Sequence, residues 1–107
     1  MKAISRGREV IPYENYEELK YLVMRVLTDM IKNTRGNCIT FTSKKIALKA
    51  GLNPQPILLT VIREILESLR ERNVIRRYSK SSRGIKYIVT SNSPLWTAVR
   101  SNLKIIR

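Results

Sequence analysis

The sequence predicts a mostly helical α+β fold. Apolar residues recur at helical spacing in two long segments, residues 14–33 and 58–69, and this period is typical of amphipathic helices. Residues 74–78 and 85–89 instead alternate at a period of two and are rich in β-branched and aromatic side chains, which predicts two strands. Ser-Ser-Arg-Gly at 81–84 lies between them, so we expect a β-hairpin.

The length and composition predict one folded domain. The chain has 107 residues, 43% of them hydrophobic, and no linker rich in Gly, Ser or Pro divides it. We expect residues 13–107 to form this domain and residues 1–12 to be a flexible basic N-terminal arm. Pro12 discourages a helix before it. The arm either reaches for phosphate or is a solvated tail.

The first helix is expected from residue 14 to residue 33. Glu14, Glu17 and Glu18 lie in its first turns, where negative side chains complement the helix dipole. Its apolar stripe is wider than one packed face needs, and consists of Tyr16, Leu19, Tyr21, Leu22, Val23, Met24, Val26, Leu27, Met30 and Ile31. The excess predicts contact with a C-terminal helix or with a second copy of the chain.

A short strand and a short helix follow. Residues 38–42, Cys-Ile-Thr-Phe-Thr, alternate in the manner of a strand. Ser43 is expected to cap a helix over 44–50, which ends at Gly51, a residue suited to the left-handed turn after a helix. Cys38 is the only cysteine and cannot form an internal disulfide. We expect it to be a small buried apolar residue, with redox sensing as the alternative.

The third helix begins near Pro54 and Pro56, because proline is tolerated in a first turn. It ends at Asn73, where the chain needs a positive φ that asparagine tolerates well. Its buried side consists of Leu58, Val61, Ile62, Ile65, Leu66 and Leu69. A last helix begins at Ser93 and Pro94, by the N-cap and first-position preferences, and we expect it to pack on the first helix.

The charge balance indicates a polyanionic partner. The chain carries 21 Lys and Arg against 8 Asp and Glu, a net charge of +13, and no acidic residue follows Glu71. Such an excess is typical of nucleic-acid binding, with an anionic membrane surface as the competing partner. No apolar run approaches the roughly 18–20 residues that span a bilayer, and no signal-peptide core follows Met1. We therefore expect a cytoplasmic protein.

The composition disfavours catalysis and metal binding. The chain has no histidine, which removes most zinc sites, the common Ser and Cys nucleophile systems and the usual general base near neutral pH. Its acidic residues gather on the outward faces expected for the first and third helices, and they form no positioned acid-base pair. We expect neither enzymatic activity nor a cofactor.

Residues 62–77, IREILESLRERNVIRR, resemble the winged helix-turn-helix superfamily of prokaryotic DNA-binding proteins. Members share an apolar recognition helix, a Leu-x-x-x-Gly turn and a basic hairpin called the wing, and Leu69 and Asn73 stand at the positions of that Leu and Gly. The resemblance covers residues 38–90, about half of the chain, and is nearest to small basic archaeal members. It implies that the third helix enters the major groove of double-stranded DNA, while the wing lies along the backbone or in the minor groove.

By position, the resemblance implies three groups of DNA contacts. The turn and recognition helix supply Asn53, Gln55, Thr60 and Arg63; the second helix supplies Ser43, Lys44, Lys45 and Lys49; the wing supplies Arg76, Arg77, Lys80, Ser82, Arg83 and Lys86. The hairpin holds no acidic residue to pair these cations. The outward face of the third helix is poor in groups that read base edges; it carries Pro56, Ile57, Thr60, Arg63, Glu64 and Glu67. We expect mainly phosphate contacts and a modest sequence preference.

These features favour a transcription regulator or a small nucleoid-associated chromatin protein. We expect a homodimer formed through the first and last helices, since paired winged helices read two half-sites. In the alternative, these outer helices only bury each other. A structural RNA-binding role, as in ribosomal components, and protein contact within a replication or transcription assembly are the other candidate functions. The sequence identifies no target sequence and no effector.

Overall fold

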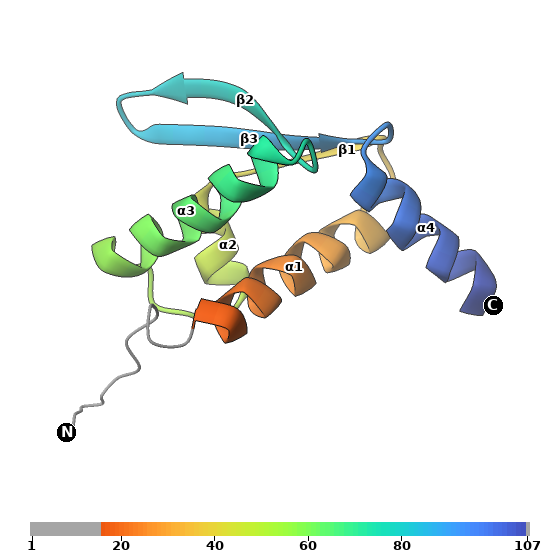
Figure 1. The fold of residues 1–107 in the computed structure, drawn as a ribbon, viewed down its shortest axis with the longest axis horizontal. Helices are drawn as coiled ribbons and strands as arrows, with labels where there is room; N and C mark the ends of the chain where they lie inside the picture. Colours follow the sequence, from red (N-terminus) through yellow and green to blue (C-terminus); the bar gives the residue numbers. More distant parts are fainter. Residues whose placement is uncertain (1–15, 107) are drawn as a thin grey trace.

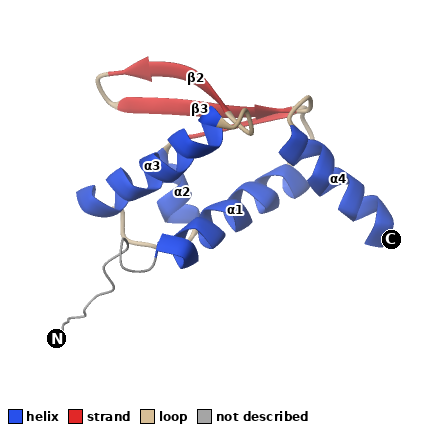
Figure 2. Cartoon of the chain, in the orientation of Figure 1, coloured by secondary structure: helices blue, strands red, loops and turns tan. Residues whose placement is uncertain are grey.

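The computed structural model describes residues 16–106, and this part of the chain forms four helices and one three-stranded sheet (Figure 1). The elements are α1 (Tyr16–Asn33), β1 (Cys38–Phe41), α2 (Ser43–Lys49), α3 (Pro56–Glu71), β2 (Arg76–Ser81), β3 (Gly84–Thr90) and α4 (Pro94–Ile106). The strands are antiparallel in the order β1-β3-β2, and the helices lie on one side of the sheet (Figure 2). The mostly helical α+β fold is confirmed. The expected arm at 1–12 lies outside the described residues.

One face of the sheet is buried against the helices. Ile39, Phe41, Tyr87 and Val89 are all buried, and the register pairs Ile39 with Val89 and Phe41 with Tyr87. Cross-strand neighbours share a face because side chains alternate along each strand. The rings of Phe41 and Tyr87 stack with their centroids 6.0 Å apart. This face therefore forms one wall of the core.

The helices supply the rest of that core, and the buried residues make a single cluster. All six residues predicted for the buried side of α3 are buried, which confirms its helical stripe. In α1 the buried residues are Leu19, Val23, Val26, Leu27 and Ile31, whereas Tyr21 is 64% exposed. Within residues 16–106, none of the helices has the length and apolar character needed to cross a membrane.

The cap of α2 differs from the prediction. Thr42, not Ser43, precedes the helix with an extended backbone (φ −119°, ψ 169°), and its side-chain oxygen accepts a hydrogen bond from the Lys45 N–H at 3.1 Å. β1 ends at Phe41, one residue earlier than expected. The helix consequently begins one residue earlier, and Ser43 is its first residue rather than its cap.

The start of β2 also differs, because the turn after α3 is longer than expected. Asn73 has φ 65°, as predicted. The Val74 N–H then donates to the Leu69 carbonyl at 3.0 Å, and Ile75 is buried in the core. Val74 and Ile75 therefore belong to the connection that leaves α3, and β2 begins at Arg76.

α4 packs on α1, as predicted. The Ser93 hydroxyl accepts a hydrogen bond from the Leu95 N–H at 3.2 Å, which satisfies one unpaired donor at the start of the helix. Trp96 and Val99 are buried in the common core. Contact between the two outer helices is thus present within one chain, and it accounts for part of the wide apolar stripe of α1.

Arg100 joins α4 to the C-terminal end of α1. Its Nη2 donates to the carbonyl oxygens of Ile31 and Thr34, both at 3.0 Å. Its guanidinium carbon lies 5.2 Å from the ring centroid of Trp96, where a cation is attracted by the aromatic face. A cation at this position also complements the negative end of the helix dipole. Its Nε is buried without a partner, which offsets part of the gain.

We expect Arg100→Ala to lower the free energy of unfolding by about 1–2 kcal/mol, because two charge-assisted hydrogen bonds outweigh one unsatisfied donor. Urea denaturation followed by circular dichroism measures this. Arg25→Ala is the control, since Arg25 is exposed on α1. An equal change in the two variants would contradict a role for Arg100 in docking α4.

Candidate functional site

The β2–β3 hairpin carries cations on both of its faces. The register pairs Arg77 with Tyr87 and Lys80 with Ile85. Tyr87 is buried against the helices, so both cations lie on the face turned toward α3. A β-bulge between Arg77 and Ser79 makes this possible, because without the extra residue positions 77 and 80 would alternate to opposite faces.

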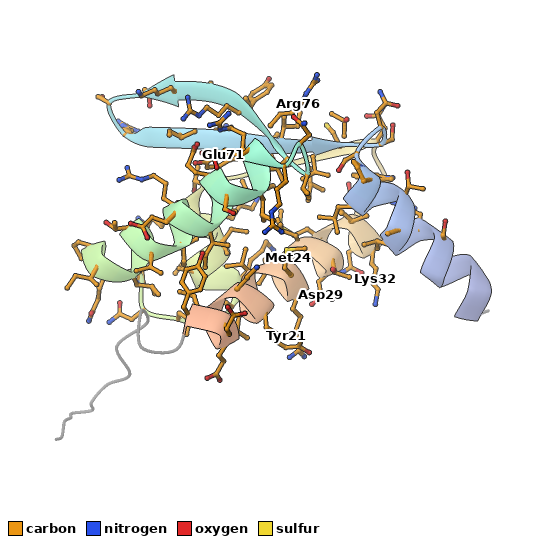
Figure 3. All side chains as sticks on the ribbon, viewed as in Figure 1. Tyr21, Met24, Asp29, Lys32, Glu71 and Arg76 are labelled. Atoms are coloured by element: carbon orange, nitrogen blue, oxygen red, sulfur yellow. The ribbon has the colours of Figure 1, made fainter. Side chains whose placement is uncertain are left out.

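The other basic residues of the strands lie on the opposite face. Arg76 pairs with Ile88, and Ser79 pairs with Lys86, so Arg76 and Lys86 point away from α3. Figure 3 shows Arg76 on the outer side of the sheet. The structure therefore divides the predicted hairpin contacts into two groups, and only one group borders the third helix.

An open groove of about 370 Å³ lies between α3 and the hairpin. Side chains from both elements meet there: Arg63 and Glu67 come from α3, while Arg77, Lys80, Ser81, Ser82, Gly84 and Ile85 come from the hairpin. Four of the predicted contact residues, Arg63, Arg77, Lys80 and Ser82, thus line one hollow. Their positions in the sequence do not show that these four residues lie together. They meet because the hairpin folds over α3.

Glu67 forms a network inside this groove. Its Oε1 accepts hydrogen bonds from Arg70 Nε at 2.7 Å and from Arg77 Nη2 at 2.9 Å. Its Oε2 accepts from Arg77 Nε at 3.2 Å and from the Tyr87 hydroxyl at 2.6 Å. One carboxylate therefore binds side chains from α3, β2 and β3. The expectation that no carboxylate pairs the hairpin cations is wrong at Arg77, because the partner comes from the neighbouring helix.

These bonds stabilise the charged form of the carboxylate. The hydrogen bonds from Arg77 lower the pKa of Glu67 from 4.5 to about 2, against an opposing effect of burial, with further lowering from Tyr87 and Arg70. The pKa of Tyr87 is raised, first by burial and then by its hydrogen bond to Glu67. The Tyr87 hydroxyl thus remains a donor and Glu67 remains an acceptor at neutral pH.

Sequence reasoning missed the roles of Glu67 and Tyr87. Helical spacing places Glu67 on an outward face of the third helix, and the sequence marks Tyr87 only as one residue of an alternating strand. The position of Tyr87 opposite Arg77 follows from the hairpin register, which the bulge shifts. A polar tip on a buried ring is the one signal that was available, since a buried tyrosine hydroxyl usually finds a partner.

The beginning of α3 presents an apolar surface. Pro56 is exposed and Ile57 is 60% exposed. The Thr60 hydroxyl donates to the Pro56 carbonyl at 3.0 Å, so its proton is already used, and its methyl group is left for apolar contacts. Asn53 and Gln55 are exposed in the turn before the helix, and Gln55 makes no capping bond with its side chain.

The lysines of α2 do not border the groove beside α3. Lys44, Lys45 and Lys49 are exposed, but Lys45 and Lys49 line a separate cavity of about 490 Å³ bounded by α1, β1 and α2, which also contains Asp29. The Lys45 Nζ donates to a backbone carbonyl of β1 at 3.5 Å. Ser43 is half-buried at the start of α2.

The hairpin tip is exposed and basic. Ser82 and Arg83 form the turn, and the Arg83 N–H donates to the Ser81 hydroxyl at 3.2 Å. Gly84 follows with φ 128°, a conformation that residues with a side chain rarely adopt. The backbone therefore keeps the Arg83 side chain at the end of the hairpin.

No family model matches the chain, and no curated protein sequence matches it significantly. Within the described residues, no group of three or more Cys, Asp, Glu or His is placed to hold a metal ion.

The pKa of Glu67 predicts a pH-dependent stability. Because the folded-state pKa lies below 4.5, the stabilisation is fully present above about pH 5 and is lost as the pH falls toward 2. We expect Glu67→Gln to lower the free energy of unfolding by on the order of 1 kcal/mol at pH 6, since partial solvent exposure screens these pairs. The difference from the wild type should shrink toward zero near pH 2 in urea titrations.

Glu64→Gln is the matched control, because Glu64 is exposed on the same helix. It should not reproduce the loss of stability at pH 6. A difference between Glu67→Gln and the wild type that stayed constant from pH 6 to pH 2 would contradict this account of the network.

Proposed function

We propose that the chain is a double-stranded DNA-binding protein of the winged-helix type, with α3 as the recognition helix and the β2–β3 hairpin as the wing. It acts as a transcription regulator or a small chromatin protein. The observation that carries the proposal is the convergence of Arg63 from α3 and Lys80 from the hairpin on one groove. The carboxylate in that groove is already bonded to two guanidinium groups.

The order of elements supports the same proposal. A short strand, two helices joined by a turn and a basic hairpin follow each other between residues 38 and 90, and the hairpin runs along α3 with its tip toward the beginning of that helix (Figure 1). An exposed basic hairpin beside an exposed helix fits a duplex, whose phosphates line both edges of each groove. The net charge of +13 adds long-range attraction.

Homodimer formation through α1 and α4 is part of the proposal. Tyr21 remains 64% exposed on α1 although α4 packs on the same helix. A two-fold contact here would place two recognition helices on one duplex, as paired half-sites require.

The proposal predicts salt-dependent binding that depends on the groove and tip cations. Lys80→Ala combined with Arg83→Ala should weaken binding to a random 20-base-pair duplex by at least about ten-fold at moderate salt. The slope of log K against log salt should become shallower by about two, because each phosphate contact contributes about 0.9. Fluorescence anisotropy over a salt series measures both quantities.

The charge-matched control is Arg35→Ala combined with Arg72→Ala, two exposed residues that lie outside the groove, the hairpin and the outer helices α1 and α4. The control should bind within about two-fold of the wild type. An equal loss in both variants would show that net charge alone drives binding. A duplex RNA of the same sequence that bound more tightly than the DNA would favour the RNA-binding alternative.

The apolar beginning of α3 predicts which bases are preferred. Ile57 and the Thr60 methyl group can contact the C5-methyl group of thymine, the apolar feature of the major groove. Replacing thymine by deoxyuridine removes this methyl group without changing the phosphate charge. We expect affinity to fall roughly four-fold per contacted methyl group, from the transfer free energy of one buried carbon.

Competition anisotropy with the two duplexes measures this preference. Ile57→Ala combined with Thr60→Ser removes both apolar groups, so this variant should bind both duplexes equally and serves as the internal control. If the wild-type protein already binds both equally, the beginning of α3 does not read thymine.

A further inference from the structure

The outer half of the hairpin has little support from the sheet. β1 pairs with β3 only over Tyr87–Thr90, and Phe41 opposite Tyr87 is its last paired residue. Every residue of β2 is exposed. From Ser79 to Lys86 the hairpin therefore continues as a two-stranded ribbon over α3 (Figure 1). Isolated two-stranded ribbons are marginally stable and strongly twisted. Within residues 79–86 only Ile85 packs, partly buried, against the core, so packing alone leaves the angle of the tip weakly fixed.

The Glu67 network attaches the hairpin to α3 at Arg77 and Tyr87, the last position at which β3 is also paired with β1. Arg77 and Tyr87 face each other across the two strands, and Glu67 binds both of them. Arg77 contributes two nitrogen donors, one to each carboxylate oxygen, a geometry that restricts rotation as well as distance. The bulge directly after Arg77 changes the twist of β2 at the same point.

The same bonds pair the positive charge of Arg77 with the negative charge of the Glu67 carboxylate. Its Nε and Nη2 edge is directed at Glu67, so a phosphate in the groove would have to compete with an ionised carboxylate for this guanidinium. Arg63 and Lys80 line the groove and take part in no salt bridge within the described residues. The resemblance implies by position that Arg77 contacts DNA, whereas in the structure the hydrogen bonds of Arg77 link β2 to α3.

We propose that Glu67 is a positioning residue, which fixes the hairpin to α3 through Arg77 and Tyr87. In this proposal Arg77 is a structural link between β2 and α3 rather than a phosphate contact. This inference rests on the proposed DNA binding of the groove. Its structural half, the fixed orientation of the hairpin, does not require DNA and is tested separately.

The first experiment measures hairpin orientation without DNA. Nitroxide labels are attached at S82C on the hairpin tip and at L48C on α2, in a C38S background. Pulsed electron paramagnetic resonance then measures the distance between the hairpin and α2. We expect Glu67→Gln combined with Arg77→Gln to broaden the distance distribution while the net charge stays unchanged. Tyr87→Phe removes one hydroxyl and should broaden it less. Thermal unfolding shows that each variant is folded.

The charge-matched control is Glu71→Gln combined with Arg72→Gln, at the end of the same helix. Both residues are exposed, and Figure 3 shows Glu71 at the end of α3. This variant should keep the wild-type distribution. An unchanged distribution in the Glu67/Arg77 variant, or the same broadening in the control, would overturn the positioning role.

The second experiment measures duplex binding over a salt series. If the hairpin reaches its binding orientation only a fifth of the time, affinity falls about five-fold at every salt concentration. The Glu67/Arg77 double variant should therefore give a line parallel to that of the wild type. Lys80→Gln should instead make the slope shallower by about 0.9, as loss of one phosphate contact requires.

The outcomes separate the two proposals. A slope that also becomes shallower by about 0.9 in the Glu67/Arg77 variant would identify Arg77 as a phosphate contact and overturn its role as a structural link between β2 and α3. If the wild-type protein binds no duplex, the proposed function fails, and the label distances alone then decide whether Glu67 orients the hairpin.

Discussion

The carboxylate of Glu67 is the constraint on which the shape of the groove depends. The apolar core fixes α3 and the sheet up to the pair of Phe41 and Tyr87, where the rings stack. Beyond that pair the hairpin has no third strand beside it, Ile85 is only partly buried against the core, and all of β2 is exposed. Two strands without a third partner resist twisting weakly. Because Glu67 binds one residue on each strand, it transmits the rigidity of the core to the part of the hairpin that carries Lys80 and the tip.

The placement of the positive charge matters more than its amount. A net charge of +13 produces general attraction to polyanions, but at physiological salt this attraction decays over about 8 Å. Short-range selection depends on which cations share a surface. The structure directs Arg76 and Lys86 to the outer face of the sheet and Lys45 and Lys49 to a cavity beside α1. Only a few of the cations face α3, and these give the groove its own charge pattern.

The sequence predicted the elements whose stability comes from apolar burial, and it did not predict the side-chain network between them. The stripe of α3 and the positive φ of Asn73 were predictable, because each follows from local spacing or from one residue's backbone preference. The contact between Glu67 and Arg77 spans ten residues and depends on the hairpin register. Simple alternation places residues 77 and 80 on opposite faces, and the bulge at Tyr78 reverses that result. Nothing in the order of exposed polar residues specifies where a bulge occurs. The α2 cap shows the same limit on a smaller scale, since Thr42 and Ser43 are both suitable caps.

A carboxylate in a groove proposed to bind phosphate needs a physical justification. Two like charges about 6 Å apart repel by roughly 0.7 kcal/mol in water and by roughly 3 kcal/mol at an effective dielectric constant of 20. Glu67 does not act alone, however, because Arg70 and Arg77 bind the same carboxylate at 2.7 and 2.9 Å. The three groups together carry a net charge of +1, so a phosphate approaching the cluster is attracted rather than repelled. The low pKa of Glu67 follows from the same pairing. An uncharged residue at this position would leave two guanidinium groups side by side, whose mutual repulsion would separate the hairpin from α3. The carboxylate thus stabilises the orientation of the hairpin while the groove keeps its positive sign.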